Sequence, residues 1–219
     1  MRRNQLKKLN STSRKRVSGG LLDAFDKSLP FELTAGQIAV CKEIESDLAQ
    51  PHPMHRLLQG EVGSGKTIVA LRAMLAVVDS GGQAALLAPT EVLAAQHLRT
   101  IQRQLGELAQ GGMLGGADIG TQVTLITGSQ TAQARREALA MAADGTAGIV
   151  IGTHALLGES VVFKDLGLIV VDEQHRFGVE QRDALKEKAV LPPHLLVMTA
   201  TPIPRTVAMT VFGDLDVST

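Results

Sequence analysis

The chain has 219 residues and a formal net charge of zero, from 22 basic and 22 acidic residues. Hydrophobic residues make up 44% and charged residues 20%, which is typical of a globular protein and excludes a disordered or collagen-like chain. The single cysteine, Cys41, excludes an internal disulfide, and its helical surroundings predict a core position. The longest apolar runs are far shorter than the roughly 18 residues of a membrane helix. We therefore expect no membrane partner and a reducing, cytoplasmic setting.

The basic charge is concentrated at the start of the chain. Residues 1–20 hold seven basic residues and no acidic one, so residues 21–219 carry 15 basic against 22 acidic residues, a formal charge of −7. A general positive field that attracts nucleic acid is therefore excluded for the body, and any nucleic-acid site on it is local. With no Trp or Tyr, an aromatic platform for stacked bases is not expected. Residues 1–27 form a basic arm, interpreted as a phosphate-binding segment, a solvated tail or the remnant of a preceding domain.

From residue 28 onward, short apolar runs alternate with helical patterns. Thr34 is a natural N-cap for a helix over residues 35–49, and the glycine-rich residues 106–120 predict a loop. Several of the apolar runs have no polar alternation, so both of their faces are expected to be covered, as in a parallel sheet between helices. The predicted fold class is α/β. The expected strands lie at residues 55–59, 84–88, 122–127, 148–151, 167–172 and 195–199.

Residues 60–67 read GEVGSGKT, which fits the phosphate-binding pattern G-x-x-x-x-G-K-[ST]. The segment follows an apolar run and opens a helical pattern, as it must for backbone N–H groups to face a phosphate. Lys66 would reach the β- and γ-phosphates, and the Thr67 hydroxyl would be a Mg²⁺ ligand. A glycine-rich turn beside a helix is the alternative. By itself the motif fits kinases, transporter ATPases, GTPases and helicases. The candidate nucleotide-binding residues are Gly60, Glu61, Val62, Gly63, Ser64, Gly65, Lys66 and Thr67.

Asp172 and Glu173 end a predicted buried strand, at the edge where ligands bind in open α/β sheets. Asp172 is predicted to hold Mg²⁺ from its second coordination shell or through water, and Glu173 to orient and deprotonate the water that attacks the γ-phosphate. A pair of acids that caps a helix is the alternative. His175 is predicted to contact the nucleotide as a γ-phosphate sensor or to relay to the next strand, with a structural histidine as the alternative. A catalytic carboxylate such as Glu173 favours hydrolysis over phosphoryl transfer.

Five motifs occur in order: GEVGSGKT, APTEVLAAQH at 88–97, GTHALL at 152–157, DEQH and TATP. They resemble motifs I, Ia, Ib, II and III of superfamily 2 helicases and translocases. More narrowly, LLQGEVGSGKT, DEQHRFGVEQR and MTATPIPRTVAMTVFGDL are similar to the RecG family of bacterial branched-DNA helicases, over about residues 28–219. The resemblance implies a RecA-like P-loop fold, ATP and Mg²⁺ as cofactors, and branched or double-stranded DNA as partner. It also implies that Gln37 contacts adenine, with a surface helix glutamine as the alternative. The residues it assigns to coupling are Gln174, Thr199 and Thr201.

A DNA track is predicted from three hydroxyl residues, Thr90, Ser129 and Thr153. Each stands where a strand or loop passes into a helix, so hydroxyl and N–H groups there could hold successive phosphates without reading sequence. Helix N-caps that bind no ligand are the alternative. Three arginines could pair with DNA or with acids of a second domain: Arg176, Arg182 and Arg205.

The resemblance also sets the expected domain organisation. Residues 28–219 would be the first of two RecA-like domains, with the second domain and its arginine finger absent. An arginine finger is worth about 10³–10⁵ in rate, so the chain is expected to hydrolyse ATP poorly by itself. The expected function is the ATP-binding half of a branched-DNA helicase of DNA repair and recombination, active in fork regression and branch migration. A truncated module that binds Mg-ATP without hydrolysis is the alternative. A P-loop kinase or transporter ATPase is disfavoured, because Glu173 would activate water and no LSGGQ-type signature is present.

Overall fold

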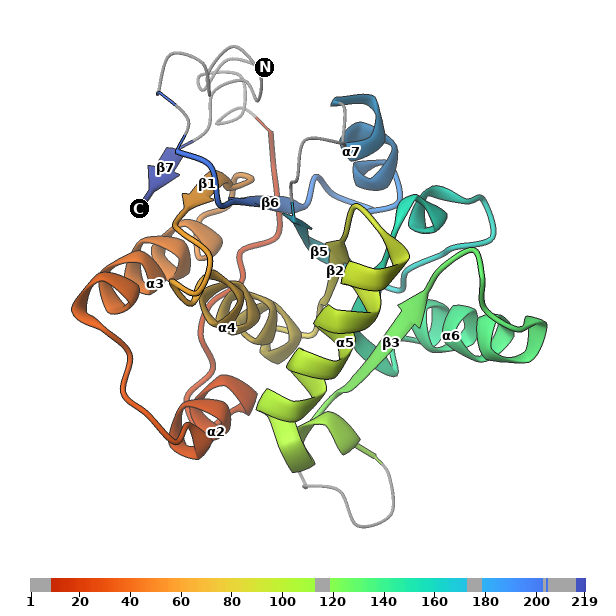
Figure 1. Cartoon of the computed structure of the whole chain (residues 1–219). Coiled ribbons are helices and arrows are strands. Elements are labelled where there is room, and N and C mark those ends of the chain that lie inside the picture. The colour runs from red at the N-terminus through yellow and green to blue at the C-terminus, as the bar shows by residue number, and fades with distance from the viewer. Residues whose placement is uncertain (1–8, 113–118, 173–178, 203, 205–215) are drawn as a thin grey trace.

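The computed structural model describes residues 9–112, 119–172, 179–202, 204 and 216–219 (Figure 1). Its strands form one sheet in the order β3-β4-β2-β5-β6-β1-β7, and every pair among them is parallel. The predicted α/β class with a parallel sheet is confirmed. The strands are β1 (His55–Gln59), β2 (Gln83–Leu87), β3 (Gln122–Ile126), β4 (Ala147–Gly152), β5 (Leu166–Asp172), β6 (His194–Thr199) and β7 (Asp216–Ser218).

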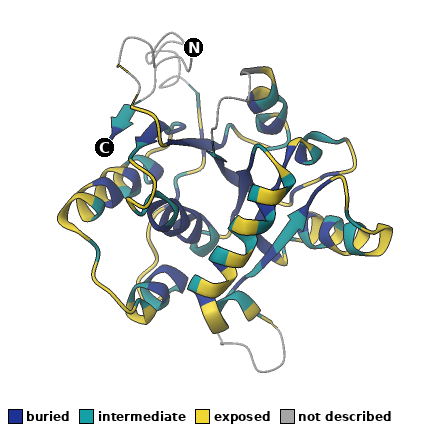
Figure 2. Ribbon diagram, in the orientation of Figure 1, coloured by how far each residue is buried: buried dark blue, intermediate teal, exposed yellow. Residues whose placement is uncertain are grey.

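Helices cover both faces of this sheet because neighbouring strand residues enter opposite cores. Val170 of β5 joins one apolar cluster and Val171 joins the other. The first cluster lies under α2 to α5, and the second lies under α6, α7 and η2. The central strands are accordingly buried, while the outer faces of the helices are exposed (Figure 2). The helices are α2 (Leu21–Ser28), α3 (Ala35–Leu48), α4 (Lys66–Asp79), α5 (Glu91–Leu105), α6 (Ala132–Asp144) and α7 (Val179–Lys186), with 3₁₀ turns η1 (Gly106–Gln110) and η2 (His154–Leu157).

All six predicted strands are present, each within one residue of its predicted ends. The helix predicted after Thr34 is also confirmed, and it begins with a capping box. The Thr34 hydroxyl accepts the Gln37 N–H at 3.2 Å, and the Gln37 side chain accepts the Thr34 N–H at 2.9 Å. Cys41 on this helix is buried, as expected. The loop predicted over residues 106–120 is partly wrong, because its first five residues form η1.

The described part of the N-terminal segment packs against the body. Leu21, Leu22 and Phe25 of α2 are buried in the first core cluster. Before them, Ser11 donates its N–H to the Pro51 carbonyl at 2.7 Å. A domain boundary at residue 27 stays a prediction, although α2 shares its core with α4. None of the described helices combines the length and apolar character that a membrane crossing requires.

Candidate nucleotide site

The candidate site lies at the carboxyl edge of the sheet, where β1, β6 and β5 end side by side. β6 pairs with both β1 and β5. Strand neighbours lie roughly 4.8 Å apart, so the segment after β1 and the end of β5 are separated by about two strand spacings. The backbone N–H of Gly60 donates to the Thr199 carbonyl at 3.2 Å, which joins the start of the glycine-rich segment to the end of β6. The parallel topology therefore brings the predicted phosphate-binding loop, Asp172 and Thr199 to one edge.

The phosphate-binding loop turns through two glycines in the left-handed region. Gly63 has φ 86° and Gly65 has φ 84°, a conformation that disfavours residues with a Cβ. Gly65 is also the N-cap of α4 and supplies no side-chain cap to the helix. The first N–H groups of a helix have no intrahelical partner, and a helix N-terminus attracts negative charge. This loop and helix start are therefore built to receive an anion.

Lys66, the first residue of α4, bends back over the loop. Its Nζ donates to the Gly60 carbonyl at 2.5 Å and to the Glu61 carbonyl at 2.9 Å. Partial burial lowers the pKa of Lys66 from its ordinary 10.5, while the negative charge of Asp172 opposes that shift. The charge of Asp172 therefore influences the protonation of Lys66. Both contacts of the ammonium are to neutral carbonyls, so an anionic phosphate would be a stronger partner for it.

Gln37 lies against the same loop from α3. Its side-chain amide donates to the Ser64 carbonyl at 3.1 Å, while its oxygen serves the capping box. A Cβ on Gly65 would collide with this amide, so the close approach requires glycine. A cavity of about 180 Å³ opens beside the amide, lined by Thr34, Gly36, Gln37, Val40, Leu58, Gln59, Gly60, Ser64, Lys66, Val69 and Thr219. The predicted adenine contact and the phosphate-binding loop therefore share one cavity.

Asp172 ends β5 and meets a residue that the sequence analysis did not single out. Its Oδ2 lies 2.6 Å from Nε2 of His97, with side-chain exposures of 21% and 13%. His97 is the last residue of the segment at 88–97. Because His97 follows the N-cap Thr90 by seven residues, it lies about two turns into α5. That spacing could not by itself reveal a contact with Asp172.

The three predicted DNA-binding hydroxyls have intramolecular partners. The Thr90 hydroxyl accepts the Leu93 N–H at 3.2 Å as the N-cap of α5, and Thr153 caps η2. Ser129 is not a cap, because α6 begins after Thr131. Its hydroxyl donates to the Glu91 carboxylate at 2.5 Å, and its N–H donates to the same carboxylate at 3.1 Å.

The remaining predicted site residues divide between described and undescribed parts of the chain. Thr67 lies in the first turn of α4, and the buried Thr199 accepts the Thr201 N–H on its hydroxyl at 3.2 Å. Arg182 is buried on α7, only 5% exposed, and so does not present its side chain to solvent. Five residues lie outside the described residues: Glu173, Gln174, His175, Arg176 and Arg205.

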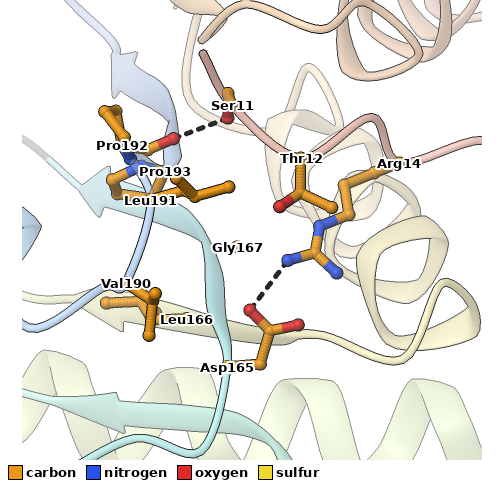
Figure 3. Close-up of a pocket in the computed structure, with 10 residues that line it drawn as sticks. All are labelled: Ser11, Thr12, Arg14, Asp165, Leu166, Gly167, Val190, Leu191, Pro192 and Pro193. Carbon is orange, nitrogen blue, oxygen red and sulfur yellow. Dashed lines mark hydrogen bonds and ion pairs between the residues drawn. The ribbon is translucent and has the colours of Figure 1, made fainter. Parts of the chain in front are cut away.

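A second cavity, of about 160 Å³, lies at the opposite edge of the sheet, where β5 and β6 begin (Figure 3). The buried Arg14 guanidinium donates to Asp165 at 2.9 Å, and the Ser11 hydroxyl donates to the Pro192 carbonyl at 2.5 Å. These contacts tie the N-terminal segment to the loops that precede the two strands. The cavity is thus part of a structural junction, remote from the glycine-rich loop.

Comparison with known proteins agrees with this geometry. Residues 34–210 match the family model described as DEAD/DEAH box helicase. The chain belongs to the DEAD/DEAH box helicase family. The matched range begins at the N-cap Thr34 and includes the phosphate-binding loop, Asp172 and Thr199. As a DEAD/DEAH box helicase domain, the chain has the RecA-like fold that its motifs predicted.

Relatives within this helicase family are named as RecG. The chain is 64% identical over 204 residues to the ATP-dependent DNA helicase RecG of Mycobacterium tuberculosis, across 92% of this chain and 28% of that protein. It is 48% identical to RecG of Streptococcus pneumoniae, across 98% of this chain and 31% of that protein. A solved structure of RecG bound to a three-way DNA junction superposes with a TM-score of 0.79 at 39% identity, across 98% of this chain and 27% of that one. The chain thus spans less than a third of each of these relatives.

The described oxygen donors fit a magnesium ion that arrives with a nucleotide. Membership of this helicase family implies Mg²⁺ as a cofactor. Mg²⁺ usually retains several water ligands and is coordinated by one or two protein oxygens together with phosphate oxygens. The Asp172 carboxylate at the end of β5 and the Thr67 hydroxyl in the first turn of α4 supply such oxygens. Within the described residues, no group of three or more His, Cys, Asp or Glu side chains could hold a metal by itself.

Proposed function

We propose that this chain is the ATP-binding motor domain of a RecG-type helicase, which couples ATP hydrolysis to movement on branched or double-stranded DNA. The observation that carries the proposal is that the parallel sheet brings the phosphate-binding loop after β1 and Asp172 at the end of β5 to one edge. The fold superposes on RecG bound to a DNA junction with a TM-score of 0.79 at 39% sequence identity. DNA repair and recombination, through fork regression and branch migration, is the proposed process. A cytoplasmic setting, a basic arm over residues 1–27 and a motor domain over 28–219 remain parts of the proposal.

Each proposed site residue has a distinct task. The loop from Gly60 to Gly65 and the start of α4 surround the β-phosphate with N–H groups, and Lys66 moves from its two carbonyl contacts to the phosphates. Thr67 and Asp172 would hold Mg²⁺, which would neutralise phosphate charge when bound. The amide of Gln37 contacts adenine at the cavity that it already lines.

The hydrolytic step is assigned to residues beside Asp172. Glu173 accepts a proton from the attacking water, and His175 senses the γ-phosphate. The change at the γ-phosphate is relayed by Gln174, Thr199 and Thr201. The hydrogen bond from Gly60 to Thr199 supports this role for Thr199, because it joins the phosphate-binding loop to the end of β6. Thr90, Ser129 and Thr153 would contact DNA phosphates. An arginine finger from a second RecA-like domain would speed hydrolysis, so residues 1–219 tested alone should turn over ATP slowly.

Binding of a fluorescent ATP analogue, with and without Mg²⁺, tests the nucleotide site. We expect Lys66→Ala to abolish Mg-dependent binding, whereas Lys42→Ala, at an exposed lysine of α3, should bind as the wild type does. ATP turnover is then measured with and without forked DNA, using Glu173→Gln as the blank. Binding without turnover supports a motor half that needs its partner domain. Failure of the wild type to bind Mg-ATP would refute the proposed function.

A further inference from the structure

His97 joins α5 to the proposed magnesium ligand. Its Nε2 lies 2.6 Å from Oδ2 of Asp172, and both side chains are largely shielded from solvent. An ionised carboxylate can only accept hydrogen bonds, so the imidazole is the donor and carries a proton on Nε2. Hydrogen bonds to charged acceptors are short and about twice as strong as neutral ones. The contact therefore restrains the orientation of the Asp172 carboxylate.

The helix around His97 is itself fixed in place. Ala94 and Ile101 precede and follow His97 by three and four residues, so the three share one helix face, and both apolar side chains are fully buried. At the start of α5, Glu91 accepts two hydrogen bonds from Ser129. The imidazole thus projects from a helix anchored on the sheet and on the loop after β3. A donor held this way can set the direction of an acceptor rather than follow it.

We propose that His97 is a positioning residue for Asp172, which orients the carboxylate so that Mg²⁺ accompanying the nucleotide binds in the productive site. The inference rests on the proposed function, because it takes Asp172 as a magnesium ligand. Holding Oδ2 by a hydrogen bond fixes where the other oxygen of the same carboxylate points. Groups that orient a metal ligand in this way commonly contribute about 10- to 100-fold to metal affinity.

A purely structural role makes a different prediction. If His97 only filled space between α5 and β5, an apolar side chain of similar size would serve equally well. If the hydrogen bond matters, the donor must be kept at the position of Nε2. Glutamine places an amide near that position, whereas asparagine carries the same amide one methylene short of it. His97→Gln and His97→Asn are therefore a matched pair that differ in reach, and His97→Leu removes the donor.

The experiment titrates Mg²⁺ into the whole chain mixed with a fluorescent ATP analogue, after a first titration in EDTA. We expect His97→Leu and His97→Asn to raise the Mg²⁺ concentration at half-maximal binding by about tenfold. Their affinity for the metal-free nucleotide should stay unchanged, and His97→Gln should restore the Mg²⁺ dependence. Gln96→Ala, at an exposed neighbour on α5, is the control. Urea unfolding of each variant identifies any that does not fold. If His97→Leu does not fold, the comparison of His97→Gln with His97→Asn tests the positioning role.

Two failures can be told apart. If the wild type binds nucleotide through Lys66 but all His97 variants keep its Mg²⁺ dependence, the positioning role is wrong and the proposed function stands. Equal losses in EDTA and in Mg²⁺ would also overturn the role, because they indicate a general disturbance of the pocket. If the wild type binds no nucleotide at all, the proposed function fails and the role of His97 fails with it.

Discussion

Met54 donates its backbone N–H to Nδ1 of His194 at 2.9 Å, while Nε2 of the same ring lies 3.0 Å from the Thr12 carbonyl. Because Nδ1 accepts, the neutral ring carries its proton on Nε2 and donates it to the carbonyl. The ring is fully buried, and burial lowers the pKa of His194. His194 therefore joins the N-terminal segment, the residue before β1 and the start of β6 in its neutral form only.

The fold should lose stability as the pH falls below about 6.5, the ordinary pKa of histidine. Burial, with the nearby charges of Lys186 and Arg182, lowers the pKa of His55 to about 3, and His194 is lowered as well. The unfolded chain then binds more protons than the folded chain, so acid favours unfolding, and His55 alone removes about 2 kcal/mol by pH 5. Urea unfolding at neutral and mildly acidic pH measures this, and His55→Gln should flatten the dependence. An equal slope in the variant would contradict the assignment.

Arg14 should be a strong anchor of the N-terminal segment. Its side chain is 3% exposed and donates to Asp165, and a Cβ on Gly167 would lie 2.9 Å from its guanidinium (Figure 3). Arg14→Ala should lower the free energy of unfolding by about 2 kcal/mol, through lost packing and lost hydrogen bonds. Lys15→Ala, at an exposed neighbour, should have little effect. Urea unfolding compares the stability of the two variants, and equal stabilities would show that the Arg14 side chain does not anchor the segment.

Ser218 should hold β7 onto the sheet. Its hydroxyl receives a hydrogen bond from Arg56 at 2.6 Å and donates to Glu43 at 2.5 Å. Ser218→Ala leaves two charged groups without this partner, so we expect a loss of about 1–2 kcal/mol in unfolding free energy. Nucleotide affinity should fall too, because the next residue, Thr219, lines the nucleotide cavity. Ser46→Ala, at an exposed position on α3, is the control. Equal nucleotide affinities of the two variants would show that β7 does not contribute to nucleotide binding.

The sequence could predict what depends on local pattern. Six short apolar runs predicted six strands, and the runs without polar alternation predicted strands buried on both faces. The spacing of GEVGSGKT predicted the loop and the start of α4. β7 was missed, because three residues carry no periodic signal and its pairing depends on Arg56, far away in sequence. The contact between His97 and Asp172 was missed for a similar reason. Their 75-residue separation is closed by sheet topology, which a motif does not encode.

Gln37 should serve two separable roles. Its oxygen completes the capping box with Thr34, and its amide contacts the Ser64 carbonyl beside the cavity. Gln37→Glu keeps an oxygen for the cap but removes the amide donor, whereas Gln37→Ala removes both. We expect both variants to lose preference for ATP over GTP, and only the alanine variant to lose about 1 kcal/mol of stability. Competition binding measures the preference for ATP over GTP, and urea unfolding measures the stability. An unchanged base preference in both variants would exclude an adenine contact.

Glu91 should oppose DNA binding at the loop after β3. The Ser129 hydroxyl and the N–H groups of Ser129 and Gly128 lower the pKa of Glu91, so its carboxylate stays charged and occupies donors that a DNA phosphate would use. Glu91→Gln should therefore raise affinity for a three-way junction severalfold, most clearly at low salt, where phosphate contacts contribute most. Glu137→Gln makes the same charge change on the exposed face of α6 and is the matched control. Fluorescence anisotropy over a salt series measures both. Weaker binding by Glu91→Gln alone would mean that the carboxylate orders this loop for DNA instead of competing with it.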